Sequence, residues 1–384
     1  MPRNAREQLS EKQRDQMRGC LFGGAAGDAL GYAVEFMDER SIFLKYGDEG
    51  ITQYDLDTYS GKAEISDDTQ MTLFTANGLL VGDTRGRMRG IRTWPRHYVA
   101  DAYQDWLDTQ RYPKSKVEER ERVSWLWEVP ELHHRRAPGN TCLTALQTRR
   151  HRKHVSDYIA SSINTSKGCG GVMRVAPVAL NVTLDMEALD MEAAQIAAIT
   201  HSHSLGYMPA AVLCHIINRI VFPGESPMTL KEIVLEAKET CEKLFRWDEC
   251  LAELTGLIDI AVKLSENHID DLENIQVLGE GWVAEETLAI AIYCSLRHAN
   301  DFSAGIIAAT NHSGDSDSTA AVTGNILGAL LGYEALEDKW KENLECADVI
   351  LEMADDLWAG CRMSEFSDYD DPAWTRKYIE MHWK

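Results

Sequence analysis

The sequence predicts a single all-α domain with a short polar extension at its N-terminus. Proline is scarce, at 10 of 384 residues, whereas alanine, leucine and glutamate are abundant. Several apolar segments repeat with the spacing of a helix, and the alternation typical of strands is rare. Because no linker and no internal repeat interrupts the chain, we assign residues 1–16 to the extension and residues 17–384 to one domain.

The N-terminal third begins with an apolar segment, MRGCLFGGAAGDALGYAVEF, at residues 17–36. Its glycine and alanine content predicts that another helix approaches closely around Asp28 and Glu35. Residues 37–65 contain turn signals and predict a loop-rich connection. The segment DDTQMTLFTANGLLVG, which begins at Asp67, has apolar residues at helical spacing and predicts the next helix.

The rest of the chain continues the helical pattern. Residues 83–140 are rich in basic and aromatic side chains and predict short helices with loops, and residues 168–180 predict a glycine-rich turn leading into an apolar helix. A long amphipathic helix is expected after Thr200, and two charged surface helices are expected within residues 228–274. A further helix is expected from Trp282.

Charge and cysteine content exclude several classes of protein. The net charge of −22 would repel a phosphate backbone, so we expect no nucleic-acid partner. The nine cysteines are odd in number and contain no CxxC pair, which predicts reduced thiols rather than disulfides or a zinc site. The N-terminus has no apolar signal region and no run approaches the ~18 apolar residues of a membrane span, so we expect a cytoplasmic protein that does not contact membranes.

The stretch HSGDSDSTAAVTGNILGALLG, residues 312–332, gathers short oxygen-bearing side chains at the start of an apolar helix. Asp315 and Asp317 flank one serine, and Ser318 and Thr319 follow. Three interpretations compete: an N-cap of the helix, a calcium-binding loop, or half of a metal site.

The calcium loop is excluded by its spacing. With Asp315 at position 1 of an EF-hand loop, position 6 is Ala320 rather than glycine and position 12 is Ile326 rather than glutamate. An N-cap needs a single oxygen, worth about 1 kcal/mol. Two neighbouring carboxylates repel one another unless a cation lies between them, so the metal site stays open beside the cap.

A second acidic cluster lies in EISDDTQMTLF, where Ser66, Asp67, Asp68 and Thr69 also open an expected helix. The DDxxD motif of helical prenyl-diphosphate enzymes is excluded because Met71 stands where its last carboxylate is needed. If the two clusters face each other across a cleft, their ligands are hard oxygens without histidine or cysteine. Such a set favours Mg²⁺ or Mn²⁺ over zinc.

Five stretches in this order resemble the ADP-ribosylglycohydrolases, most of all the branch named for the dinitrogenase reductase-activating glycohydrolase, which includes arginine-directed ADP-ribosyl hydrolases. They cover roughly residues 18–336 and are GCLFGGAAGDALGYAVEF, SDDTQMTLFTANGLL, GCGGVMRVAPVAL, THSHS and HSGDSDSTAAVTGNILGALLG. The resemblance implies a compact orthogonal helix bundle with two Mg²⁺ ions, or Mn²⁺, at the base of a cleft. It also implies hydrolysis of the bond between ADP-ribose and a protein side chain, usually arginine.

Carried over by motif, the resemblance implies six metal ligands: Ser66, Asp67, Asp68, Asp315, Asp317 and Ser318. Serine stands at both positions where the family usually has threonine and keeps the ligating hydroxyl. Glu35 closes the first motif, and we expect Glu35, Asp68 and Asp315 to be the catalytic residues. Glu35 or a ligand carboxylate would take the proton of the attacking water.

For the substrate, the resemblance implies that the glycine-rich turn lies against the ribose and diphosphate. Cys169 stands where the family commonly has asparagine, and Ser166 where some members have aspartate. A contact of His201 with adenine or ribose competes with a role in starting the next helix or in the core. The residues expected to bind substrate are Gly168, Cys169, Gly170, Gly171, Met173, His201 and Tyr59.

The leading hypothesis is therefore a Mg²⁺-dependent hydrolase that removes ADP-ribose from arginine of a modified protein. One rival is an immunity-type protein that neutralises a cognate ADP-ribosyltransferase by occluding it, with or without hydrolysis. Another rival is hydrolysis of serine-linked or small-molecule conjugates of ADP-ribose. An Asp67→Ala variant separates the first two, since occlusion would survive it and an enzyme-only role would not.

Overall fold

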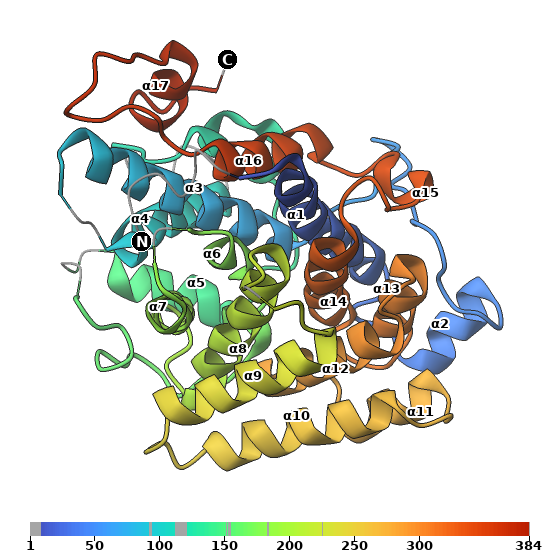
Figure 1. Ribbon diagram of the computed structural model, residues 1–384. Coiled ribbons are helices and arrows are strands. Elements are labelled where there is room, and N and C mark those ends of the chain that lie inside the picture. Colours follow the sequence, from blue (N-terminus) through green and yellow to red (C-terminus); the bar gives the residue numbers. More distant parts are fainter. Residues whose placement is uncertain are drawn as a thin grey trace.

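The computed structural model describes residues 9–91, 94–111, 121–150, 152, 155–182, 184–224 and 226–383. Within these residues the fold is almost entirely helical, and no strand is formed beyond two isolated bridges. The expected all-α class is confirmed (Figure 1). The first half of the chain forms α1 (Glu11–Tyr32), α2 (Glu39–Tyr46), α3 (Asp67–Met88), α4 (Pro95–Thr109), α5 (Asn140–Arg149), α6 (Ala176–Ala179), α7 (Met186–Ala197) and α8 (Ser204–Val221).

The second half continues with helices alone. These are α9 (Leu230–Leu244), α10 (Leu251–Ser265), α11 (Asp271–Leu278), α12 (Ala284–Arg297), α13 (Phe302–Thr310), α14 (Ser316–Leu331), α15 (Asp338–Lys341), α16 (Ala347–Ala359) and α17 (Pro372–Tyr378). Three helices rather than two fill residues 228–278, because the chain turns again before α11.

Helix α1 begins earlier than the expected domain boundary. The Ser10 side chain accepts a hydrogen bond from the backbone N–H of Gln13, whose own side chain accepts from the Ser10 backbone, and this reciprocal cap starts the helix at Glu11. Residue 16 therefore lies inside a helix whose next residue, Met17, is fully buried. Residues 1–8 of the expected extension lie outside the described residues.

Helices α1 and α14 pack backbone against backbone, and Figure 1 shows them side by side. A Cβ atom on Gly324 would overlap the carbonyl oxygen of Gly23, and one on Gly328 would overlap that of Gly19. Only glycine permits this approach, because any side chain would force the helices apart. The close approach predicted from the glycine-rich first segment is thus present.

Helix α8 crosses the core, and charged helices cover it. Among the described residues, α8 alone is long and apolar enough to cross a membrane by length and composition, and 89% of this helix is buried inside the protein. Helices α9 and α10 run along one side of the molecule in Figure 1 and present charged residues outward. A buried apolar helix of this kind is what a core element requires.

We predict that Gly324→Ala lowers the free energy of unfolding by about 1–3 kcal/mol, the usual cost of overpacking a core. The new methyl group must push α14 away from the Gly23 carbonyl. Urea denaturation of the two proteins measures the difference.

The matched control is Gly256→Ala in α10, where an added Cβ meets nothing within 4 Å. That change should leave the protein unaffected or stabilise it by up to about 1 kcal/mol, because alanine favours the helix. Equal stability of Gly324→Ala and wild type would show that the two backbones are not in contact.

Candidate functional site

Three helix ends converge on one acidic cluster. Glu35 lies in the turn that follows α1, Asp67 and Asp68 open α3, and Asp315 to Ser318 open α14. The two clusters noted in the sequence meet directly, since the Ser318 hydroxyl donates a hydrogen bond to Asp68 Oδ2 at 2.8 Å across 250 positions of sequence.

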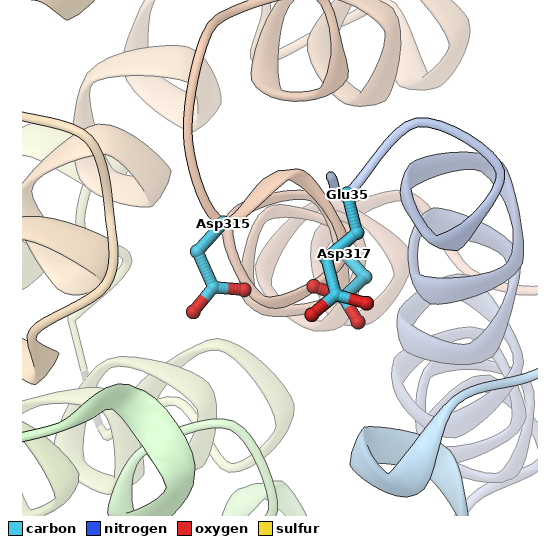
Figure 2. A group of neighbouring side chains, drawn as sticks. All are labelled: Glu35, Asp315 and Asp317. Atoms are coloured by element: carbon cyan, nitrogen blue, oxygen red, sulfur yellow. The ribbon is translucent and has the colours of Figure 1, made fainter. Parts of the chain in front are cut away.

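Glu35, Asp315 and Asp317 form the tightest group. Each offers one carboxylate oxygen, and these oxygens lie within 4.8 Å of one another. Figure 2 shows Glu35 reaching from the α1 side and the two aspartates reaching from the start of α14. All three side chains are buried. The group has the size and composition of a set of cation ligands.

Asp28 is a member of the site that the predicted residue set did not include. Its carboxylate accepts hydrogen bonds from the backbone N–H groups of Ser66 and Thr69, at 3.1 and 3.0 Å, and from the Thr69 hydroxyl. Asp28 on α1 thereby holds the N-terminus of α3, where exposed N–H groups favour a negative charge. A lone carboxylate within a glycine-rich apolar segment was the sequence signal for it.

Backbone contacts hold the acidic residues in place. The N–H of Gly139 donates to Asp67 Oδ2 at 3.2 Å, and the Asp67 N–H donates to the Arg136 carbonyl at 3.1 Å. On the other side the Asp315 N–H donates to the Glu280 carbonyl at 2.8 Å. These bonds involve main-chain groups, so the aspartates are positioned by the fold itself.

The side chain at the N-cap position caps the helix at the start of α3 but not at the start of α14. Ser66 is the N-cap of α3, and its hydroxyl accepts from the Asp68 N–H at 3.1 Å. Asp315 occupies the N-cap position of α14, yet its side chain makes no capping hydrogen bond. The N-cap interpretation is therefore wrong for the Asp315 carboxylate, which is directed to the cluster instead.

Six buried carboxyl groups share this site without any cationic partner. Within the described part of the chain, no lysine, arginine or histidine forms an ion pair with them, and Glu35 Oε2 has no hydrogen-bond partner at all. Burying charges is costly unless they are paired or bind a metal. The six are Asp28, Glu35, Asp67, Asp68, Asp315 and Asp317.

The pKa values of these carboxyl groups also show that their charged forms are unfavourable here. Burial, followed by repulsion from Asp317, raises the pKa of Glu35 to about 9 and that of Asp28 to about 7. The same two causes raise the pKa values of Asp68 and Asp315 well above the ordinary range. A cation among these groups would remove the repulsion, and an all-oxygen set fits Mg²⁺ or Mn²⁺. Ser66, Asp67, Asp68, Asp315, Asp317 and Ser318 could hold such ions.

The glycine-rich turn, with the short helix η5 (Cys169–Gly171), borders the cluster. The Cys169 thiol contacts Asp315 Oδ2 at 2.7 Å, and burial raises the pKa of that thiol well above its usual value. Met173 is buried beside Ser318, whose Oγ lies 3.9 Å from its sulfur. A Cβ on Gly170 would lie 2.8 Å from Cε1 of His201, so this histidine packs against the turn.

Tyr59 is not brought to the cluster. Its side chain is 97% exposed, in a turn held by hydrogen bonds of the Tyr59 and Ser60 N–H groups to Asp57. The notable aromatic pair near the site is a different one. Phe36 follows Glu35 directly, and its ring stacks on that of Trp282 with centroids 6.5 Å apart and planes at 21°.

Trp282 is anchored to both flanks of the site. Its carbonyl accepts the Cys169 N–H at 3.2 Å, and Glu280, two residues earlier, binds the Asp315 N–H. The Phe36 and Trp282 side chains remain 76% and 41% exposed. Sequence reasoning missed this pair, because Phe36 and Trp282 are far apart in the chain and only the packing of the helices brings them together.

We predict that Mg²⁺ or Mn²⁺ raises the melting temperature and that EDTA reverses the effect. A ligand at one hundred times its Kd adds about 2.7 kcal/mol to stability. Asp317→Asn should stabilise the metal-free protein, because it removes a repelling charge, and should reduce the gain from Mg²⁺. Calorimetry measures both effects.

Asp48→Asn is the control, because Asp48 is exposed on the surface. It should keep the melting temperature and the Mg²⁺ response of the wild type. An undiminished Mg²⁺ response in Asp317→Asn would place the ion elsewhere.

The chain is similar in sequence and in fold to proteins of one known family. The family model described as ADP-ribosylglycohydrolase matches residues 9–366. The chain is 28% identical over 205 residues to human ADP-ribosylhydrolase ARH3, covering 47% of this chain and 54% of that protein. It is 21% identical over 363 residues to ADP-ribosylarginine hydrolase Tri1 of Serratia proteamaculans, covering 90% and 79%.

A solved structure described as an ADP-ribosylglycohydrolase-related protein complex shares the fold, with a TM-score of 0.59 at 21% identity, over 92% of this chain and all of that one. The family acts on ADP-ribosylated substrates and generally uses divalent metal ions. The family match spans nearly the whole chain. This protein belongs to the ADP-ribosylglycohydrolase family and is an ADP-ribosyl hydrolase.

Proposed function

We propose that this protein is a Mg²⁺-dependent hydrolase that removes ADP-ribose from arginine side chains of modified proteins. The observation that carries the metal dependence is the group of six buried carboxyl groups without a cationic partner among the described residues. Two ions are proposed, with Mn²⁺ able to replace Mg²⁺, because ligands come from two separate helix starts.

The ligands proposed for these ions are Ser66, Asp67, Asp68, Asp315, Asp317 and Ser318. When bound, divalent cations supply Lewis acidity that holds hydroxyl groups of the ribose and makes a water molecule more acidic. A nearby cation also favours the charged form of a carboxyl group, so the aspartates and Glu35 act as carboxylates in the loaded enzyme.

Glu35 is the proposed general base. Its Oε2 is buried and has no hydrogen-bond partner in the described part of the chain, so it is available to accept the proton of the attacking water. Asp68 and Asp315 stabilise the positive charge that develops at the anomeric carbon of the ribose. The turn from Gly168 to Gly171 borders the cluster, and we propose that it receives the ribose and diphosphate.

The aromatic pair supports arginine as the leaving side chain. The leaving group is bonded to the carbon under attack, so it must lie near Glu35, and Phe36 is the next residue. The exposed faces of Phe36 and Trp282 suit a planar guanidinium, which aromatic rings attract through their quadrupole. The name of the Serratia relative, an ADP-ribosylarginine hydrolase, is consistent with this substrate.

We predict that the protein releases free ADP-ribose from an arginine-ADP-ribosylated protein in Mg²⁺ and not in EDTA. Asp315→Ala should lower kcat/KM by about 10³-fold, because losing this ligand weakens the hold on an ion whose Lewis acidity is worth several kcal/mol. Chromatography of released ADP-ribose measures the rate, and Asp48→Asn should retain it.

Two other outcomes have distinct meanings. Release from serine-linked but not arginine-linked substrate would contradict the arginine assignment alone. If Asp67→Ala still protects a target from an ADP-ribosyltransferase, occlusion of the transferase rather than hydrolysis would be the function.

We predict that Trp282→Ala lowers kcat/KM for arginine-linked substrate roughly 2- to 30-fold, the range of a cation–π contact. The loss for serine-linked substrate should be smaller, because serine carries no cation. Trp282→Phe keeps an aromatic face and should recover most of the rate. Equal losses on both linkages would assign the pair a role unrelated to the leaving group.

A further inference from the structure

Arg174 is fully buried beside the glycine-rich turn and lacks a carboxylate partner within the described residues. Its Nη1 donates to the sulfur of Cys142 at 3.3 Å, and its guanidinium lies 4.7 Å from the centroid of the Tyr103 ring. Its Nε has no hydrogen-bond partner among the residues that the structure describes. Burying a charge with so few polar partners costs free energy, so packing alone does not explain why an arginine occupies this position.

The strongest contact of Arg174 leads toward His201. Nη2 donates to Thr200 Oγ1 at 2.5 Å, and the same oxygen lies 2.8 Å from His201 Nδ1. Burial, with the Arg174 charge as a second cause, lowers the pKa of His201 to about 3. His201 is therefore neutral at ordinary pH and carries one proton, on either Nδ1 or Nε2.

The hydroxyl of Thr200 decides between these two positions. A guanidinium can only donate, so Thr200 Oγ1 accepts from Arg174 with one lone pair and keeps one lone pair and one hydrogen. Accepting from a cation polarises the hydroxyl, which makes it a stronger donor and a weaker acceptor toward His201. An imidazole nitrogen accepts that hydrogen far better than the nearby thiol sulfur of Cys142. Nδ1 of His201 is then the acceptor, and the ring proton belongs on Nε2.

Nε2 faces the turn that borders the acidic cluster. A Cβ on Gly168 would lie 3.4 Å from Nε2, and one on Gly170 would lie 3.3 Å from it. No described residue forms a hydrogen bond with Nε2. Because these glycines carry no side chains, the buried His201 ring lies directly against the turn, with Nε2 on that side.

We propose that Arg174 is a positioning residue that acts through Thr200 to hold the proton of His201 on Nε2, so that His201 presents an N–H donor to an anionic or hydroxyl oxygen of the ADP-ribosyl group. The direction of the bond matters, because a lone pair at Nε2 would repel the oxygens of a diphosphate. This proposal rests on the proposed function only in naming the ligand of the turn.

The test is ¹⁵N NMR of the full-length protein labelled at histidine, with the His201 signals assigned from a His201→Gln variant. A protonated Nε2 and an unprotonated Nδ1 in the wild type support the proposal. Protonation of Nδ1, or an even mixture of the two forms, overturns it. This measurement needs no activity, so its outcome is independent of whether arginine is the substrate.

Substitutions at Thr200 separate positioning from packing. Thr200→Val keeps the shape but removes the hydroxyl, and should give a mixture of His201 tautomers and roughly a 2- to 10-fold rise in KM, the range of one hydrogen bond, with kcat changed less. Thr200→Ser keeps the hydroxyl and should retain the Nε2 proton. An unchanged tautomer in Thr200→Val, or its loss in Thr200→Ser, overturns the proposal.

The Arg174→Met variant tests whether the hydrogen bond from Arg174 to Thr200 influences His201. It keeps an apolar side chain of similar length. It should give mixed tautomers, because a Thr200 hydroxyl that no longer accepts from a guanidinium is a weaker donor to Nδ1 and a better acceptor of a hydrogen bond from an Nδ1–H. A folded variant with an unchanged His201 tautomer overturns the role of Arg174. If this variant does not fold, the wild-type spectrum and the two Thr200 variants still decide whether Thr200 holds the His201 proton on Nε2.

Discussion

Direct contact between the backbones of α1 and α14 determines where the acidic side chains lie. Gly23 and Gly324 allow the two helices to approach without intervening side chains. Asp28 and Glu35 near the end of α1 therefore stand beside Asp317 at the start of α14, and Asp28 in turn holds the first turn of α3. Repulsion among the carboxylates opposes this arrangement, and the packing of rigid helices holds the groups together against it.

The site combines two electrostatic environments. Around Glu35 the groups are acidic and lack a cationic partner among the described residues, which suits divalent cations. Behind the glycine-rich turn, Arg174 is a buried positive charge and His201 is neutral. A ligand with a ribose and a diphosphate could therefore place its hydroxyl groups on the acidic side and its phosphates near the turn.

Local patterns predicted most of the long helices and both acidic clusters, but they missed α2, which lies within the expected loop-rich connection of residues 37–65, and the third helix of residues 228–278. Asp67 and Asp315 stand out because each lies beside another carboxylate at the start of an apolar helix. The partners across space were not predictable in this way. The bond from Ser318 to Asp68 and the stacking of Phe36 on Trp282 join residues far apart in the chain, and only the packing of helices brings them together. Tyr59 illustrates the converse, since nearness in sequence to a cluster did not bring it into the cluster.

The origin of the ligands in short stretches at helix ends has an evolutionary consequence. The segments between them carry little of the chemistry, and α9 and α10 on the surface can change in length or charge without moving Asp68 or Asp315. Natural selection can therefore alter which proteins are recognised while the reaction is retained.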